Sequence, residues 1–314
     1  MSVLPTNCRV ITNCTSRKLK QGLAVSLSAK DLKLSVDAAA SKWANKVLEA
    51  KHRVAAVDLY QGRSFSDAKA VTALLQGQLH VVSAGLGLVH GNAQVPHYNL
   101  TISNGTGSIR SLLTREGATP AIWWHTLTQR LPQSQSLHEL ISGDAATTTL
   151  LALPSTYLAM VADDLDQLSR QQLAKVRIFT SSSSLSLLPA KLQEVCMPYD
   201  ERLEGHTRYA GTRADFPQRA MRHFVQELGA QAFSLEAANG AVNKALARLR
   251  KPALPERTRC SDDEIIRLLK KNWSQHGGYQ APLLRFLRDD ALVSCEQSRF
   301  ASLWREAKAQ IDPS

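Results

Sequence analysis

The sequence predicts an α/β fold, a three-layer arrangement around a parallel sheet, with a small helical unit after it. Three observations support this fold class. Short apolar runs alternate with longer stretches of helical periodicity, which is typical of a parallel sheet covered by helices on both faces. Several apolar runs end in small polar residues, as strands do where they open into loops. Beyond residue 250 the pattern changes to short amphipathic segments.

Four apolar runs are predicted to be the strands of the sheet, and they occupy residues 9–13, 79–83, 148–153 and 176–180. Residues 54–59 fit either a short strand or the start of a helix. Residues 90–108, punctuated by Asn, Gly and Pro, are predicted to be rich in loops. Between the runs, apolar residues recur near every 3.6 positions. The helices predicted from this periodicity cover residues 28–51, 67–75, 120–131, 157–165 and 215–249.

The α/β domain is predicted to span residues 1–250, and a helical domain residues 251–314. The boundary lies in a Pro-containing segment, KPALPER, whose composition is typical of a linker. Ser261 and Glu264 form a capping-box pattern that begins a helix, and two further short helices follow. Three short helices with a tight turn are typical of a helix-turn-helix or winged-helix unit that binds DNA. The alternative is a helical cap whose aromatic residues only fill a core.

The last of these helices is the candidate recognition helix. Gln and Arg side chains suit base edges, while Lys suits phosphates. A basic strip precedes the helices and could lie on the DNA backbone. The candidate DNA-binding residues are Arg257, Arg259, Gln297, Arg299, Arg305 and Lys308.

The charge of the chain also favours a nucleic-acid partner. Its 314 residues contain 38 Lys and Arg against 27 Asp and Glu, a formal net charge of +11. Such a charge attracts polyanions over a Debye length of about 8 Å at cellular salt. No apolar run approaches the roughly 20 residues that span a bilayer, and no secretion signal is visible. We therefore expect a cytoplasmic protein that does not enter a membrane; its oligomeric state is left open.

Several classes of site lack support in the sequence. The five cysteines show neither paired spacing nor Cys/His spacing, so we expect no disulfide scaffold and no metal. Walker, Gly-x-Gly-x-x-Gly and His-Glu-x-x-His motifs are missing from the sequence, which argues against nucleotide hydrolysis, dinucleotide redox chemistry and zinc proteolysis. No cofactor is expected.

Polar residues cluster where the early apolar runs end. The first loop reads Asn13-Cys14-Thr15-Ser16-Arg17-Lys18, and a later one reads Ser83-Ala84-Gly85-Leu86-Gly87. Asp58-Leu59-Tyr60, with Arg63, lies between them, and Pro96-His97-Tyr98-Asn99 follows. Open α/β sheets bind ligands at the carboxyl edge of their strands. These segments therefore predict a pocket for an anionic or base-like ligand.

These motifs resemble a bacterial and phage family of uncharacterised α/β domains, which is similar in turn to the uracil-DNA-glycosylase-like domain of archaeosine synthase. The family pattern comprises a Cys-Ser…Lys loop, an Ala-x-x-Leu-Tyr…Phe segment, a Ser-Ala-x-x-Gly-Leu strand end and Pro-Tyr-Asp. The chain also resembles bacterial anti-phage DNA glycosylases that act on glucosylated hydroxymethylcytosine. The resemblance covers about residues 9–215. Two departures are Asn99, where the pattern has Asp, and the additional Asn13 before the first loop.

The resemblance implies a uracil-DNA-glycosylase-like fold and a DNA glycosylase that excises a modified base from double-stranded phage DNA, leaving abasic sites in antiviral defence. Such an enzyme must flip the base out of the stack, which costs a few kcal/mol. One alternative is a base-exchanging transferase acting on nucleic acid. Another is a non-catalytic DNA-binding regulator that senses a nucleotide-like ligand.

Breaking an N-glycosidic bond gives the sugar oxocarbenium character, which a carboxylate or an oriented water stabilises. We expect Asp58 to be this catalytic carboxylate and Asn13 to position the water. Ser16, Lys18 and Arg63 would hold phosphates or the departing base, and Tyr60 or Tyr98 would stack on the flipped base. The full predicted set for the base or phosphates is Cys14, Thr15, Ser16, Lys18, Tyr60, Arg63, Ser83, Gly87, Tyr98 and Asn99.

Three of these residues have simpler interpretations. Asp58 could be only a helix N-cap. Tyr60 is of a type more often found in a core than on a stacking surface. Cys14 is interpreted as a small buried residue and not as a nucleophile.

Overall fold

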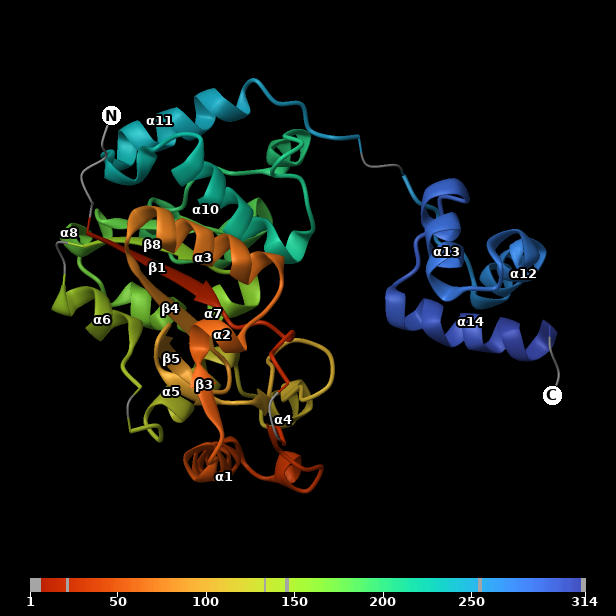
Figure 1. The fold of residues 1–314 in the computed structure, drawn as a ribbon, viewed down its shortest axis with the longest axis horizontal. Coiled ribbons are helices and arrows are strands. Elements are labelled where there is room, and N and C mark those ends of the chain that lie inside the picture. The colour runs from red at the N-terminus through yellow and green to blue at the C-terminus, as the bar shows by residue number, and fades with distance from the viewer. Residues whose placement is uncertain (1–6, 21–22, 133, 145–146, 254–255, 312–314) are drawn as a thin grey trace. The chain divides into compact units, whose positions relative to one another are not determined.

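The computed structural model describes residues 7–20, 23–132, 134–144, 147–253 and 256–311. The chain divides into two compact units, Met1–Lys251 and Pro252–Ser314 (Figure 1). This division falls one residue after the boundary predicted from the Pro-containing segment. Each unit has its own apolar core.

The first unit is built on a five-stranded sheet in the order β5-β4-β1-β8-β9. The predicted strand positions are confirmed, and the strands are β1 (Cys8–Asn13), β4 (Gln78–Ser83), β8 (Thr148–Ala152) and β9 (Val176–Phe179). These four strands run parallel. The edge strand β5 (Gly87–His90) runs antiparallel to β4, so the sheet is mixed, and the prediction of a purely parallel sheet was wrong at this edge.

The reversal into β5 has a local cause. Gly87 has φ of +70°, a left-handed conformation that glycine adopts without strain, and it lets the chain turn straight back after Ser83. The sequence pattern Ala-Gly-Leu-Gly was interpreted as a loop, so this strand was missed.

Helices cover both faces of the sheet, as the α/β prediction requires (Figure 1). On one face α3 (Arg63–Leu75) packs against α10 (Phe216–Gln226). On the other, α5 (Pro120–Thr128) packs against α7 (Ser155–Asp166), and α1 (Val36–Glu49) contacts α5. The strands between them are buried on both sides: Val10 and Ile11 of β1 have no exposed surface.

Local capping signals explain where the predicted helices begin and divide. Ser35 accepts a hydrogen bond from the Ala38 amide, so the helix predicted over 28–51 begins only at Val36. The segment predicted over 215–249 divides into α10 and α11 (Leu235–Leu246), with Gly229 at φ +57° between them. Residues 54–59 contain both predicted alternatives, the end of β3 (Arg53–Ala55) and α2 (Ala56–Leu59).

The remaining elements of this unit are short. Two small sheets pair β2 with β7 and β3 with β6. The bounds are β2 (Val25–Ser26), β6 (Gln94–Pro96), β7 (Tyr98–Asn99), α4 (Arg110–Arg115), α6 (Leu137–Gly143), α8 (Arg170–Leu173) and α9 (Ala190–Gln193).

The second unit is helical in its described residues, with α12 (Asp262–Asn272), α13 (Gln280–Arg285) and α14 (Gln297–Ile311). The Ser261–Glu264 capping box is present, as predicted. The rings of Trp273 and Trp304 stack with centroids 5.9 Å apart. A π-helical turn, Phe286–Asp290, extends α13, and residues 291–296 lead into α14, a connection longer than the three- to four-residue turn typical of helix-turn-helix units. The assignment as a DNA-binding unit stays a prediction.

Candidate functional site

The loop after β1 is held against β4 and α2 by backbone hydrogen bonds. The Cys14 amide donates to the Val82 carbonyl at 2.9 Å, and the Leu19 amide donates to the Leu59 carbonyl at 2.7 Å. An isolated antiparallel bridge joins Lys18 to Tyr60. The loop therefore runs directly beside the aromatic residue that follows α2.

The turn after β4 is anchored from two helices. Trp43 of α1 donates its indole N–H to the Gly85 carbonyl at 2.6 Å, and Trp123 of α5 donates to the Ala84 carbonyl at 2.7 Å. Ser83 Oγ accepts hydrogen bonds from the amides of the turn. A Cβ added at Gly85 would lie 2.7 Å from Cε2 of Tyr98, so a larger residue at position 85 would displace that ring.

Five side chains meet between these two segments, and we call them the hydroxyl cluster: Cys14, Tyr60, Ser83, Tyr98 and Tyr157. Tyr98 Oη lies 2.6 Å from Ser83 Oγ and 3.0 Å from Tyr60 Oη. Cys14 Sγ lies 3.1 Å from Tyr157 Oη. All five are buried. Burial, reinforced by the nearby Cys14 thiol, raises the pKa of each of the three phenols above its ordinary value, so the phenols are neutral at physiological pH.

Lys18 lies over this cluster. Its Nζ is 4.3 Å from the centroid of the Tyr98 ring and 6.0 Å from that of Tyr60. Burial lowers the pKa of the Lys18 amine below its ordinary value, and Cys14 partly opposes this shift. Within the described residues no carboxylate pairs with the amine. The side chain is nevertheless partly exposed, so Lys18 can be reached from solvent while the tyrosines beneath it cannot.

The Asn13 amide is fixed by its neighbours. Its Nδ2 donates to the Cys14 carbonyl at 2.8 Å, and its Oδ1 accepts from Nε2 of Gln218 at 2.9 Å. Gln218 comes from α10, is fully buried, and also bonds Thr12 and the Ala152 carbonyl at the ends of β1 and β8. Gln218 was missed by sequence reasoning, and its only signal was an amide on the apolar face of a helix.

Asp58 is not part of this arrangement. In the single turn of α2, Ala56 and Leu59 face inward and are buried, as is Tyr60, which follows them. At about 100° per residue, position 58 lies on the opposite side, and Asp58 is exposed. The N-cap of α2 is Ala55, so Asp58 does not fill that role either. The structure thus corrects the expectation that Asp58 lines the pocket.

The predicted stacking of Tyr60 or Tyr98 on a flipped base is also corrected. Each residue is only 1% exposed, and each hydroxyl is hydrogen-bonded inside the cluster. A ring that is sealed on both sides supports the site from beneath and offers no face to a ligand.

The other predicted residues are spread around the cluster. Thr15 bonds the Arg17 carbonyl, Ser16 is exposed, and Arg63, the exposed first residue of α3, lies beside Gly211. Gly87 serves the turn into β5. Asn99 lies in β7, paired with Ser26.

Two surface hollows lie near the cluster. The first, of about 610 Å³, includes Lys46 and His97 in its lining, and the second, of about 420 Å³, includes Arg53 and Leu86. Neither lining contains Cys14 or Lys18. His97, next to Tyr98 in the chain, lines the first hollow, and Leu86, next to Gly85, lines the second.

In the second unit, two predicted DNA contacts are used internally. Arg299 pairs with Asp262 at 2.6 Å and bonds the Cys260 carbonyl, and Arg257 pairs with Asp289 at 3.0 Å. Both ion pairs are solvent-exposed, so DNA contact by these two residues stays a prediction. The exposed residues among those predicted are Arg257, Arg259, Gln297, Arg305 and Lys308.

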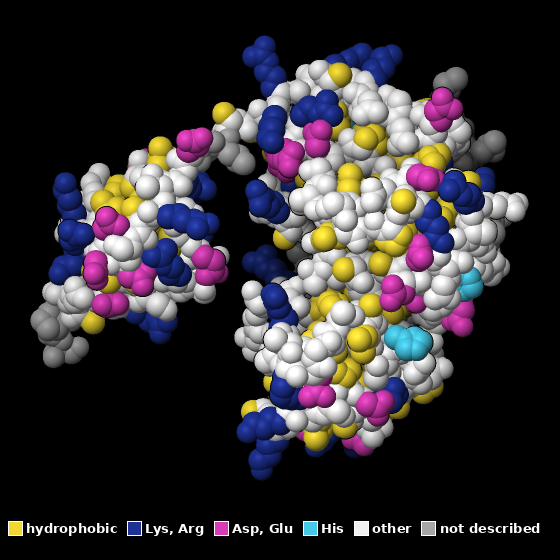
Figure 2. All heavy atoms as spheres, turned by 180° about the vertical axis from the view of Figure 1, so that it is seen from behind, with side chains coloured by type: hydrophobic (Ala, Val, Ile, Leu, Met, Phe, Trp, Pro, Cys, Tyr) yellow, Lys and Arg dark blue, Asp and Glu magenta, His cyan; other side chains and the backbone are white. Residues whose placement is uncertain are grey.

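The positive charge resides mainly in the first unit. From Pro252 to Ser314 there are 10 Lys and Arg against 9 Asp and Glu, a net charge of +1, which leaves +10 of the total +11 to the first unit. Over the face of the second unit in view, acidic and basic side chains are interspersed (Figure 2). The excess positive charge therefore lies in the α/β unit.

No known protein family, curated protein or solved structure matches this chain. In the described part of the chain, no helix combines the length and apolar character that crossing a membrane requires.

Proposed function

We propose that this protein is a DNA glycosylase that removes a modified base from double-stranded DNA and leaves an abasic site. The observation that carries the proposal is that Asn13 ends β1, and that Lys18 lies over the hydroxyl cluster at the carboxyl ends of β1 and β4. This edge is where open α/β sheets bind ligands. The net charge of +10 on the α/β unit supports a polyanionic partner.

Cleavage of an N-glycosidic bond builds positive charge on the sugar and negative charge on the departing base. In the proposal the Asn13 amide, held by Gln218, orients the attacking water. The protonated Lys18 amine gives its proton to the departing base and becomes neutral. Burial favours this transfer because it lowers the pKa of the amine toward the working pH. The phenols hold Lys18 in place and do not contact the base.

The substrate that we propose is the glucosylated hydroxymethylcytosine of phage DNA, as the motif resemblance implies. The test is to incubate the protein with phage DNA that carries this base and with unmodified DNA, and to measure alkali-labile sites and released base by mass spectrometry. Cleavage of the modified DNA alone supports the proposal. Base incorporation without strand lability would indicate a transferase, and binding without either would indicate a regulator.

Two variants test whether base release needs Asn13, Asp58 or both. Asn13→Ala is expected to abolish base release, while DNA binding persists. Asp58→Asn is expected to retain base release, because Asp58 lies on the outer side of α2. Loss of release in Asp58→Asn, with a folded protein, would restore Asp58 as the catalytic carboxylate.

A further inference from the structure

Lys18 differs from an ordinary surface lysine in its surroundings. Its amine lies 4.3 Å from the centre of the Tyr98 ring, whose hydroxyl is hydrogen-bonded to Tyr60 and Ser83. No carboxylate in the described residues compensates its charge. Burial without a carboxylate partner lowers the pKa of the amine and so favours its neutral form, which is the form with a nucleophilic lone pair.

The position of Lys18 also suits a covalent step. The loop that carries it is fixed to α2 and β4 by backbone hydrogen bonds, so the amine has a defined place at the sheet edge. Asn13, which would orient water toward the sugar, is the last residue of β1 and lies five positions before Lys18. Because the side chain is partly exposed, a sugar entering this edge can reach it.

We propose that Lys18 captures the abasic product as a covalent imine. The inference rests on the proposed function for the origin of its substrate, since base removal yields a deoxyribose whose ring-opened form carries an aldehyde at C1′. The Lys18 Nζ lone pair attacks C1′, a C1′–Nζ bond forms, and the carbonyl oxygen leaves as water with the two hydrogens of the neutral amine. No oxidant or reductant is required. The attacking species is the neutral form of the amine, which burial favours by lowering the pKa of Lys18.

The experiment supplies the abasic site in advance, so its outcome does not depend on base release by this protein. A duplex oligonucleotide with one uracil is converted to an abasic duplex by a uracil-DNA glycosylase and purified. It is then incubated with the full-length protein in the presence of sodium borohydride, which reduces an imine to a stable amine. The expected result is a protein–DNA adduct on a denaturing gel, with the modified peptide mapped to Lys18 by mass spectrometry.

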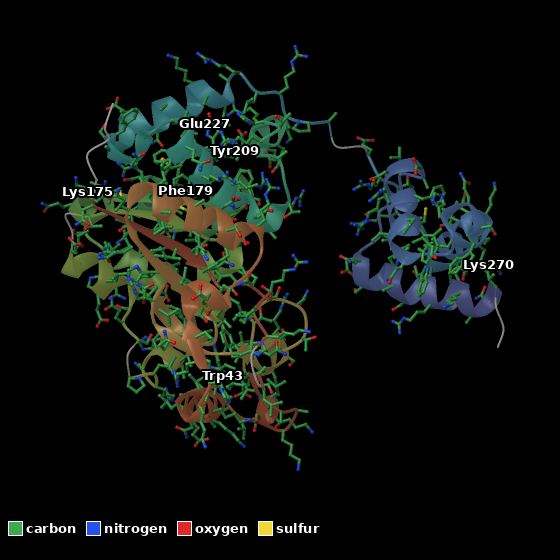
Figure 3. All side chains as sticks on the ribbon, in the orientation of Figure 1. Trp43, Lys175, Phe179, Tyr209, Glu227 and Lys270 are labelled. Carbon is green, nitrogen blue, oxygen red and sulfur yellow. The ribbon has the colours of Figure 1, made fainter. Side chains whose placement is uncertain are left out.

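Three variants sharpen the test. Lys18→Met removes the amine, and Lys18→Arg keeps a cation over Tyr98 that cannot form the imine; neither is expected to give an adduct. Lys175→Met is the matched control, because Lys175 is exposed and immediately precedes β9, at the edge of the sheet where the parallel strands begin (Figure 3). It is expected to give the adduct at the wild-type level. Circular dichroism confirms that each variant is folded.

The inference is overturned if the wild type gives no adduct with the abasic duplex, or if the adduct maps to another amine or persists in both folded Lys18 variants. Failure of the proposed function is recognised separately, as the lack of base release from modified phage DNA. If the protein traps the abasic duplex but releases no base, the imine proposal stands and the glycosylase proposal fails.

Discussion

Two cations of the α/β unit, Arg219 and Lys18, have opposite kinds of surroundings. Arg219 of α10 has no exposed surface, and it pairs with Asp215 and Glu204 at 2.7 Å each. Its guanidinium also bonds the carbonyls of Thr212 and Tyr209. The Lys18 amine lies over the Tyr98 ring, near Cys14, and pairs with no carboxylate in the described residues. We therefore expect Arg219 to have a structural role and Lys18 to be the cation that is open to chemistry.

The largest effect is expected when the compensated cation is removed. Arg219→Met leaves Asp215, which is 8% exposed, without its partner, and breaking such a buried pair costs about 3–5 kcal/mol of unfolding free energy. Urea unfolding measures the loss. Arg170→Met, which breaks an exposed pair with Glu194, is the control and should cost about 0–1 kcal/mol. Equal losses in the two variants would contradict the distinction between the pairs.

The surroundings of Lys18 can be disturbed without touching the lysine. Gly85→Ala places a Cβ 2.7 Å from Tyr98 and 3.1 Å from Trp43, and such overpacking costs about 1–3 kcal/mol. Because Tyr98 supports Lys18, imine trapping should fall as well. Gly240→Ala, in α11 with open space around it, should instead stabilise the protein by about 0.5–1 kcal/mol. Thermal unfolding measures the change in stability, and borohydride trapping measures the yield of the imine adduct. Unchanged trapping in Gly85→Ala would show that the turn after β4 does not support Lys18.

Two buried histidines provide a third case, bases kept neutral by their surroundings. Burial, with His90 and Arg9 nearby, lowers the pKa of His80 to about 3, and burial with His206 nearby lowers that of His223 to about 4, while Glu227 opposes the second shift. Both pKa values lie below the value of an unfolded histidine. The contribution of the two neutral histidines to the unfolding free energy is therefore fully present above about pH 6.5 and is lost as the pH falls toward 4.

Each histidine should contribute a slope of up to about 1.4 kcal/mol per pH unit within that window. Urea unfolding between pH 7 and pH 4.5 measures the slope. His80→Asn should flatten it relative to the wild type, and an unchanged slope would show that His80 is already charged in the folded state.

The smallest change in stability is expected at Lys18 itself. Lys18→Met replaces an uncompensated, partly buried charge by an apolar chain of similar length, so the unfolding free energy should change by less than about 1 kcal/mol. The same substitution removes the imine adduct completely. A loss of stability comparable to that of Arg219→Met would mean that Lys18 is a structural cation.

The sequence predicted the elements whose signal is local. The four parallel strands were visible as apolar runs, and the start of α12 was visible as its capping box. The edge strand β5 was missed because its glycines indicated a loop. The helix predicted over 28–51 was too long because Leu32 and Leu34, which precede the Ser35 cap, also fit the helical periodicity.

The site was predicted in part, since tertiary packing decides the rest. Cys14, Lys18, Tyr60, Ser83 and Tyr98 were chosen from strand-end motifs and do come together. Asp58 was chosen for its chemistry, but the rotation of a one-turn helix directs it outward. Gln218, about two hundred positions from Asn13, enters the site through the packing of α10, and its amide on an apolar helix face does not indicate which strand end it contacts.

The indoles of Trp43 and Trp123, which are hydrogen-bonded to the turn after β4, are a natural fluorescent reporter of that turn. Trp43 and Trp123 donate hydrogen bonds to the carbonyls of consecutive residues, one of which contacts Tyr98. Their emission should respond whenever that turn shifts. Rapid-mixing fluorescence with unlabelled DNA can therefore follow occupation of the site in real time, with Trp43→Phe and Trp123→Phe identifying which ring carries the signal.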